Sequence, residues 1–326
     1  MNGNRTSGQR GFILLVVMWL MILLSGIAIG MATTVRTDSR LARNQLEEAR
    51  TRHLAQAGIY LTVMKLLGSE REDLADAWNT PAETVTVLGV PVRVRIVDEC
   101  AKVDVNSSWG LLVTGLAAAA AGDDKDASAA IGPAILDWRD PDGRRRLKGA
   151  EDDAYSDAGQ PFGARDGPLE TIEEVQMILG VTPTIYRRLE PLITVDCLNA
   201  GVDPVIAPPS VLAAVPGIEP AALAAFLDAR ERKPVETVEI LAQTLAGDGK
   251  YFEASRKTAF NVVAAVEPSP GVLVTWRAIV RLTGDPSRPY LFRSWKRIPS
   301  DPALAPDSPR EGPGPEPVGN RRHPAG

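Results

Sequence analysis

The sequence predicts an α+β protein in which a long N-terminal helix packs on an antiparallel sheet, while a large all-α insertion interrupts that sheet. Three observations predict this fold class. An apolar run near the start of the chain continues as a helical pattern, β-branched residues alternate with others in two well-separated stretches, and the residues between those stretches carry helix-length patterns. A striped helix followed by a split antiparallel sheet is an α+β arrangement, because the sheet can cover the apolar stripe.

The first element is an apolar run over residues 12–35 that contains no charged side chain. It is long enough for a helix to cross the roughly 30 Å hydrocarbon core of a bilayer, whereas a cleavable secretory signal usually has an apolar region of only about 7 to 15 residues. Arg5 and Arg10 precede the run and no acid occurs before Asp38, which predicts a cytoplasmic N-terminus. Arginines after the run oppose this orientation, but their charge counts for less when a large domain follows. We therefore expect a single transmembrane anchor in the lipid bilayer.

The helical pattern continues beyond the anchor, so residues 12–68 are expected to form one helix. Side chains on one face recur at spacings of three and four. They are Leu46, Ala49, His53, Ala57, Tyr60, Met64 and Leu67. Gly68 is typical of a helix C-terminus. We expect this stripe to lie against the sheet.

The sheet is predicted by two separate stretches. Residues 83–99 alternate around Gly89 as a hairpin does, and the strand pattern returns in three runs over residues 258–298. Residues 100–257 are accordingly expected to form the helical insertion. Residues 299–326 contain eight prolines and few large apolar side chains. Such a segment cannot bury enough surface to order itself, so we expect it to be disordered.

The insertion contains a weak internal repeat, in which an Asp-Cys entry, a turn and an apolar helix occur at residues 97–116 and again at 195–218. This predicts two related helical modules. Residues 212–241 resemble a helix-hairpin-helix built around a Pro-Gly-Ile turn. When such a turn binds nucleic acid, its amides hold a phosphate, and Glu219 would repel that phosphate here. The net charge of −5 also gives no reason to expect nucleic acid, so a protein-packing role is favoured.

The densest acidic cluster lies in residues 135–157, around a Pro-Asp-Gly turn. Its candidate metal ligands are Asp137, Asp140, Asp142, Glu151, Asp152 and Asp153. Crowded carboxylates repel one another unless they are protonated, solvated or bridged by a cation, and a flexible all-oxygen loop suits Ca²⁺ better than a soft metal. The spacing departs from the EF-hand pattern, and the alternative is a solvated acidic loop offset by Arg139 and residues 144–146.

Catalysis has little support in the sequence. The two histidines, His53 and His323, lie in a helix and in the tail, and none of the motifs GxSxG, HExxH or GxxxxGK[ST] occurs. Paired carboxylates in the acidic cluster could serve a hydrolase, but aromatic residues make up only 5% of the chain and nothing marks a sugar-binding cleft. We expect that the protein is not an enzyme.

The two cysteines, Cys100 and Cys197, allow two interpretations. They could form a disulfide bond that closes a long loop in an oxidising compartment, or they could be two small buried thiols. The sequence alone cannot show whether their Cα atoms come within the roughly 4.4 to 6.8 Å that a bridge requires.

Several of these segments resemble the type II secretion system protein K family, whose members are minor pseudopilins. The basic leader ends in Arg10-Gly11 and Phe12 opens the apolar run, which resembles the prepilin-type processing and methylation signal that the prepilin peptidase cuts after the glycine. The Asp-Trp-Arg-Asp-Pro-Asp and Gly-Ala-Glu-Asp-Asp segments, the hairpin modules and the split sheet are also similar to protein K. The resemblance covers residues 8–297.

The resemblance implies a pilin-like fold, a leader over residues 1–11 that is removed, and an inner-membrane anchor with a periplasmic domain. It implies a position at the tip of the periplasmic pseudopilus, where the protein would help to initiate assembly for the export of folded proteins. The implied partners are the minor pseudopilins I and J, the prepilin peptidase and the inner-membrane assembly platform. The resemblance also associates the acidic cluster with structural calcium.

Val16 bears on this interpretation because it would be the fifth residue of the processed chain. Most pilin-like subunits carry Glu there, and protein K members characteristically lack it, which fits a capping or initiating subunit. The competing hypothesis is a membrane-anchored helix-hairpin-helix DNA-binding protein that resembles competence receptors, and its binding should depend on salt.

Overall fold

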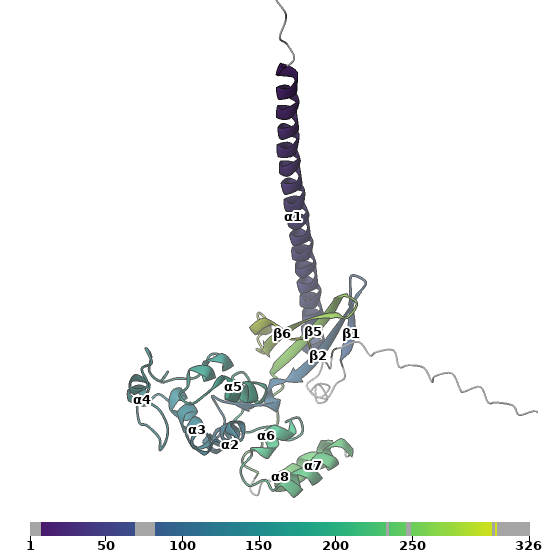
Figure 1. The fold of residues 1–326 in the computed structure, drawn as a ribbon. Coiled ribbons are helices and arrows are strands. Elements are labelled where there is room, and N and C mark those ends of the chain that lie inside the picture. The colour runs from purple at the N-terminus through teal and green to yellow at the C-terminus, as the bar shows by residue number, and fades with distance from the viewer. Residues whose placement is uncertain (1–7, 69–81, 233–234, 246–248, 302–303, 305–326) are drawn as a thin grey trace, which may run out of the picture.

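The computed structural model describes residues 8–68, 82–232, 235–245, 249–301 and 304. The chain has three parts in space (Figure 1). A long helix projects from one end, a β-sheet packs at the C-terminal end of that helix, and a helical block lies beyond the sheet, farthest from the N-terminus. This arrangement of mixed helix and antiparallel sheet agrees with the predicted fold class.

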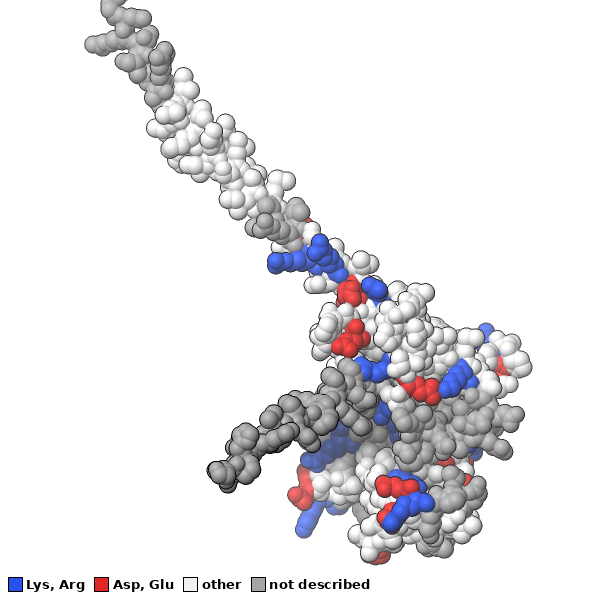
Figure 2. Space-filling model, turned by 90° about the vertical axis from the view of Figure 1, so that its right-hand side faces the viewer, with Lys and Arg blue, Asp and Glu red and all other residues white. Residues whose placement is uncertain are grey.

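The long helix α1 spans Gly8–Gly68, which is 61 residues. The prediction of one continuous helix that ends at Gly68 is therefore confirmed. Its segment Phe12–Met31 has a mean hydropathy of 2.9, none of it is buried inside the chain, and it is long and apolar enough to cross a membrane. Figure 2 shows this part of α1 without charged side chains, followed by basic side chains closer to the sheet.

The sheet has five antiparallel strands in the order β1-β2-β5-β6-β7. The strands are β1 (Glu83–Val87), β2 (Val90–Asp98), β5 (Ala259–Ser269), β6 (Val272–Leu282) and β7 (Tyr290–Ile298). The predicted hairpin is the β1–β2 pair. β2 pairs directly with β5, with Asp98 opposite Phe260, so the sheet is continuous across the insertion.

The face of α1 that packs on the sheet is not the predicted stripe. Leu46, Tyr60 and Met64 of that stripe are 71%, 43% and 68% exposed. The buried face of α1 instead consists of Thr51, Leu54, Ala55, Gly58, Ile59, Thr62, Val63 and Leu66. This face contains small residues that let the sheet approach the helix closely, since a Cβ at Gly58 would lie 2.7 Å from Val92 Cγ1. Counting apolar side chains alone selected the wrong face.

Aromatic side chains flank this contact on the β6–β7 side. Tyr60 of α1 meets Phe292 edge to face, with ring centroids 5.4 Å apart. Arg52 of α1 lies over the Trp276 ring at 5.6 Å, a distance at which a guanidinium is attracted by an aromatic face. The predicted stripe therefore lies beside the packed face of α1, and its larger side chains stay accessible.

The insertion is mainly helical, as predicted. Its helices are α2 (Gly110–Ala121), α3 (Lys125–Arg139), α4 (Asp152–Asp157), α5 (Pro183–Leu189), α6 (Pro209–Ala213), α7 (Pro220–Arg232) and α8 (Val235–Leu245), with short 3₁₀ turns η1 (Glu99–Ala101), η2 (Ile172–Met177) and η3 (Glu190–Leu192). Its hydrophobic core is separate from the core between α1 and the sheet. The insertion also contains a parallel pair of two-residue strands, β3 (Val103–Asp104) and β4 (Ile193–Thr194), which are too short to produce an alternating pattern.

The predicted hairpin over residues 212–241 falls on α6, α7 and the start of α8. α6 has only five residues, and the Pro-Gly-Ile turn lies between it and α7. Residues 233–234, between α7 and α8, lie outside the described residues. The helical nature of this segment agrees with the prediction.

The two chain segments that join the insertion to the sheet, residues 98–100 and 255–258, form a neck. Ser255 Oγ donates a hydrogen bond of 2.6 Å to Asp98 Oδ2 across it. Burial raises the pKa of Asp98 to about 6, against the opposing effect of this hydrogen bond. In the structure Cys100 is bonded to Cys197, with Cα atoms 5.0 Å apart, which is the first of the two alternatives that the sequence leaves open.

The prediction of a disordered tail over residues 299–326 is wrong at its start. Leu304 is fully buried against Val263 and Ala265, on the sheet face that α1 does not cover, and Asp301 pairs with Arg95. One leucine and one acid therefore dock the beginning of the tail. Residues 302–303 and 305–326 lie outside the described residues, as do residues 1–7 of the expected leader.

Candidate functional site

The acidic loop, residues 137–166, runs from the last turn of α3 through α4 toward η2. α4 lies at the outer end of the helical block, away from the sheet (Figure 1). Trp138, Tyr155 and Phe162 support the loop from inside, with ring centroids 5.5 to 6.3 Å apart. Tyr155 is fully buried, and its burial raises its pKa to about 12. An aromatic cluster thus holds both ends of a loop that is rich in acids.

Asp137 is the innermost acid of the loop and is fully buried. Arg146 Nη1 donates a hydrogen bond of 2.8 Å to Asp137 Oδ1 and also pairs with Asp140. A Cβ at Gly149 would overlap the Asp137 carboxylate, so a residue without a side chain is required there. Burying a carboxylate costs several kcal/mol unless it is paired, and Arg146 supplies the compensating charge.

Glu151 has no such compensation. Its side chain is 5% exposed, and within the part of the chain that the structure describes its Oε1 has no hydrogen-bond partner. Burial, followed by the negative charges of Asp137, Asp140, Asp166 and Asp152, raises the pKa of Glu151 to about 7. Asp140 Oδ1 is likewise buried without a partner among the described residues. The loop therefore concentrates negative charge that Arg146 neutralises only in part.

The other predicted ligands have different surroundings. Asp152 Oδ1 accepts a 3.0 Å hydrogen bond from the Ala164 amide, and Asp142 Oδ1 accepts one of 3.0 Å from the Arg144 amide. Asp153 is 71% exposed and lies 3.7 Å from Arg145.

The structure thus brings Asp137, Asp140 and Glu151 together, keeps Asp152 near them, and does not bring in Asp142 or Asp153. Sequence reasoning missed Asp166, which lies beyond the cluster at an Arg-Asp-Gly turn and has a φ of 54°. No spacing rule would have found it. Among the described residues, no group of three or more Asp, Glu, His or Cys side chains is arranged to hold a metal ion.

The second predicted site is the processing segment at Gly11 and Phe12. Both residues lie in the first turns of α1. Phe12 is 70% exposed and Val16 is 50% exposed. No other part of the described chain covers these two side chains.

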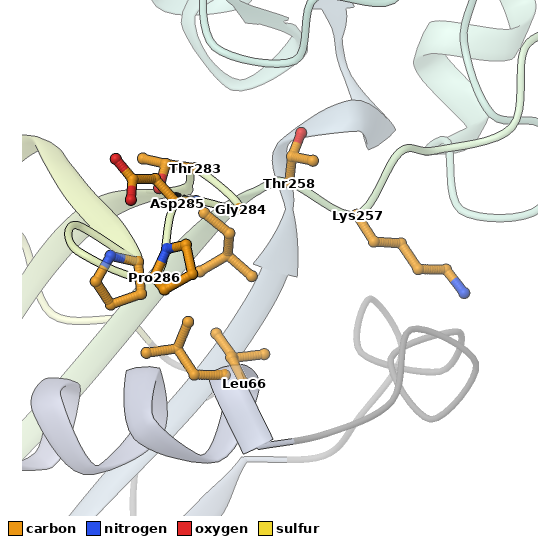
Figure 3. Close-up of a pocket in the computed structure, with 10 residues that line it drawn as sticks. Leu66, Lys257, Thr258, Thr283, Gly284, Asp285 and Pro286 are labelled. Atoms are coloured by element: carbon orange, nitrogen blue, oxygen red, sulfur yellow. Dashed lines mark hydrogen bonds between the residues drawn. The ribbon is translucent and has the colours of Figure 1, made fainter.

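A cavity of about 300 Å³ lies at the C-terminal end of α1 (Figure 3), between Leu66, the β6–β7 turn and the returning neck segment. Two of its polar side chains, Asp285 and Thr283, form hydrogen bonds within the β6–β7 turn. The Asp285 carboxylate accepts from Ser287, and the Thr283 hydroxyl donates to the Arg288 carbonyl. The cavity is therefore separate from the acidic loop, and these two polar side chains serve the turn.

Comparisons with known proteins find matches to type II secretion proteins. The family model for "Type II secretion system (T2SS), protein K" matches residues 106–196, which include α2, α3 and the acidic loop. A type II secretion system protein K from Pectobacterium carotovorum subsp. carotovorum is 25% identical over 283 residues, covering 79% of this chain and 85% of the relative. Both matches support the predicted resemblance to the protein K family of type II secretion systems, and with it a minor pseudopilin.

The fold agrees with this assignment. The crystal structure of the GspK-GspI-GspJ complex from the enterotoxigenic Escherichia coli type 2 secretion system contains a chain that matches with a TM-score of 0.54 and 17% identity. The match covers 82% of this chain and 99% of that one. The protein K family comprises secretion pseudopilins and is not a family of enzymes. The DNA-binding alternative gains no support from these matches.

Neighbouring arginines allow a test of the acidic loop. We expect Arg146→Ala to lower the free energy of unfolding by on the order of 2 kcal/mol, because it leaves the buried Asp137 unpaired although Arg146 itself is partly solvated. Arg145→Ala removes only an exposed contact to Asp153 and should cost less than about 1 kcal/mol. Thermal unfolding of the two variants measures the difference, and equal losses would contradict the pairing described here.

Proposed function

We propose that this protein K homologue sits at the tip of the periplasmic pseudopilus and, with the minor pseudopilins I and J, helps to initiate its assembly. The assembled fibre would then export folded proteins across the outer membrane. The observation that carries the proposal is the likeness, over nearly the whole of the other chain, to a protein solved in a GspK-GspI-GspJ complex. The anchor would place α1 in the inner membrane, next to the assembly platform, with the sheet and the insertion in the periplasm.

The exposed face of α1 supports a role in assembly. Outside the apolar anchor, Leu46, Tyr60, Leu61 and Met64 are each 43% to 71% exposed, and they lie on the side of α1 that the sheet leaves open. Large apolar side chains exposed together on one side of a helix are a candidate surface for a protein contact. The insertion lies at the opposite end of the molecule from the anchor (Figure 1), where it would stand above the fibre. Within the insertion, we retain a packing role for the hairpin of α6 and α7.

Binding to partners tests the proposal. We expect the full chain to co-purify with pseudopilins I and J, and Met64→Asp to reduce the recovered partners by about tenfold, because a charge at an apolar contact must be desolvated. Leu147→Asp is the matched control, since Leu147 is 91% exposed on the acidic loop and the change should leave recovery unaltered. Failure of the unmodified chain to bind either partner would overturn the proposal.

We also propose that the prepilin peptidase cuts between Gly11 and Phe12. The new amine would then belong to Phe12, and Val16 would be the fifth residue, without the carboxylate that a neighbouring amine could pair with. A carboxylate inside the bilayer is costly unless paired, so an uncharged residue suits a subunit that does not follow another one in the fibre. Mass spectrometry of the chain coexpressed with the peptidase should show Phe12 as the first residue. Any other first residue refutes the proposal.

Two buried carboxylate oxygens in the acidic loop support the proposal of a calcium ion there, although the described acids are not arranged around an ion. Glu151 Oε1 and Asp140 Oδ1 are buried oxygens without hydrogen-bond partners among the described residues, beside the buried Asp137, and hard oxygen ligands are those that Ca²⁺ prefers. We propose that Asp137, Asp140 and Glu151 hold the ion. Calcium would supply positive charge, and the residues would hold the two ends of the loop together.

Calcium binding should stabilise the full chain. We expect added Ca²⁺ to raise the melting temperature and a chelator to lower it, because a ligand that binds only the folded state stabilises it. Glu151→Gln should remove most of this calcium-dependent shift. Asp153→Asn, at an exposed acid, should retain it. A shift that is absent in the unmodified chain, or that is lost equally in both variants, would contradict this ligand set.

A further inference from the structure

A row of basic side chains on β6 and β7 contacts the helical insertion. The row consists of Arg277, Arg281, Arg293 and Lys296. On β6, Arg277 and Arg281 alternate with Ala278 and Val280, which pack in the core beneath α1, so the two arginines project from the opposite sheet face. On β7, a register shift makes Arg293 an extra residue between Phe292 and Ser294, and this puts both Arg293 and Lys296 on that same opposite face. The two faces of the same strands therefore bind two different parts of the molecule, one through apolar contacts and one through charges.

The acidic partners of this row come from three pieces of the insertion. Arg293 Nε donates a 2.8 Å hydrogen bond to Asp196 Oδ1, just after β4, and Asp196 is only 3% exposed. Lys296 pairs with Glu173 of η2. Arg277 lies 3.4 Å from Glu190 of η3.

Two backbone carbonyls complete the set. Arg281 Nη2 donates to the Asp196 carbonyl at 3.2 Å, and Arg293 Nη2 donates to the Glu170 carbonyl at 3.3 Å. Every one of the four basic side chains thus meets an acid or a carbonyl of the insertion.

The boundary between the insertion and the sheet is not part of either hydrophobic core. The core of the insertion and the core beneath α1 share no residue. A cavity of about 80 Å³ lies between the two parts, lined by Ile172, Val195 and Ile279 together with Arg293 and Lys296. This pocket is partly open, so side chains do not fill the whole boundary.

The covalent connection lies to one side of the charged row. The neck joins the insertion to β2 and β5, and it is tied by the Ser255–Asp98 hydrogen bond and the Cys100–Cys197 bridge. β7 lies two strands from β5, which is about 10 Å at ordinary strand spacing. The insertion is therefore attached covalently along one line, and the ion pairs and hydrogen bonds of the basic row connect it to β6 and β7 away from that line.

We propose that the four basic residues and Glu173, Glu190 and Asp196 form an electrostatic latch that sets the orientation of the insertion relative to the sheet. When the latch opens, the insertion pivots about the neck. The covalent bridge and the Ser255–Asp98 hydrogen bond keep the neck intact in both states. The latch is a conformational device of the fold and does not depend on the position of the chain in a fibre.

Spin labels on the full chain in detergent can measure the pivot. The labels are placed at Met64→Cys on α1 and Leu111→Cys on α2, which are 68% and 61% exposed, while the native disulfide is kept oxidised. We expect a narrow distance distribution at about 0.1 M salt that broadens about twofold at 1 M salt, because salt screens partly exposed ion pairs. Unmodified chain, labelled in parallel, shows that Cys100 and Cys197 do not react.

Charge reversal tests the latch directly. Lys296→Glu should broaden the distance distribution at low salt. Adding Glu173→Lys should reverse at least half of this increase in width, because the two charges can pair again. Arg297→Glu is the matched control, because the neighbouring Arg297 faces Glu48 of α1 at 3.7 Å and not the insertion. A Lys296→Glu distribution equal to that of the unmodified chain, or equal broadening by Arg297→Glu, would overturn the proposal. So would a failure of the double variant to recover.

Discussion

The direct pairing of β2 with β5 is the constraint on which the rest of the structure depends. Asp98 and Phe260 lie opposite each other although the whole insertion separates them in sequence. Closing so long a connection costs conformational entropy, and that cost is offset only because the insertion has a core of its own. The pairing also completes the sheet surface on which α1 packs, since Val92 of β2 and Val262 of β5 belong to the same cluster.

Because β2 pairs with β5, one sheet contacts both α1 and the insertion. The sheet packs apolar side chains against α1 on one face and pairs basic side chains of β6 and β7 with the insertion on the other. The insertion carries the acidic loop at its far end (Figure 1). The chain thus combines a long helix, whose exposed side remains apolar, with a distal helical block that contacts the sheet. The distinctive feature of the distal block is the arrangement of its buried acids and of the arginine beside them. Asp137 is compensated by Arg146, and Glu151 has no hydrogen-bond partner for Oε1 among the described residues.

Strong local patterns allowed much of the fold to be predicted. The apolar run and the helix end at Gly68, the hairpin around Gly89 and the three later strands all follow from periodicity, which depends on near neighbours. The packed face of α1 could not be found in this way. Gly58 lies on that face because Val92 approaches the helix closely there, and a glycine adds nothing to a hydrophobic pattern. The same holds for Leu304, whose burial depends on a sheet face assembled from distant strands.

By itself, the sequence determined the order and kind of the elements, the acidic cluster and the resemblance to protein K, because these depend on spacing along the chain. Only the tertiary structure decided which acids meet, since Glu151 joins Asp137 and Asp140 while Asp153 pairs with Arg145 at the surface. Only the tertiary structure showed that Cys100 reaches Cys197 and that Arg293 reaches Asp196. Such contacts join residues nearly a hundred positions apart, and no local pattern records the packing that brings them together.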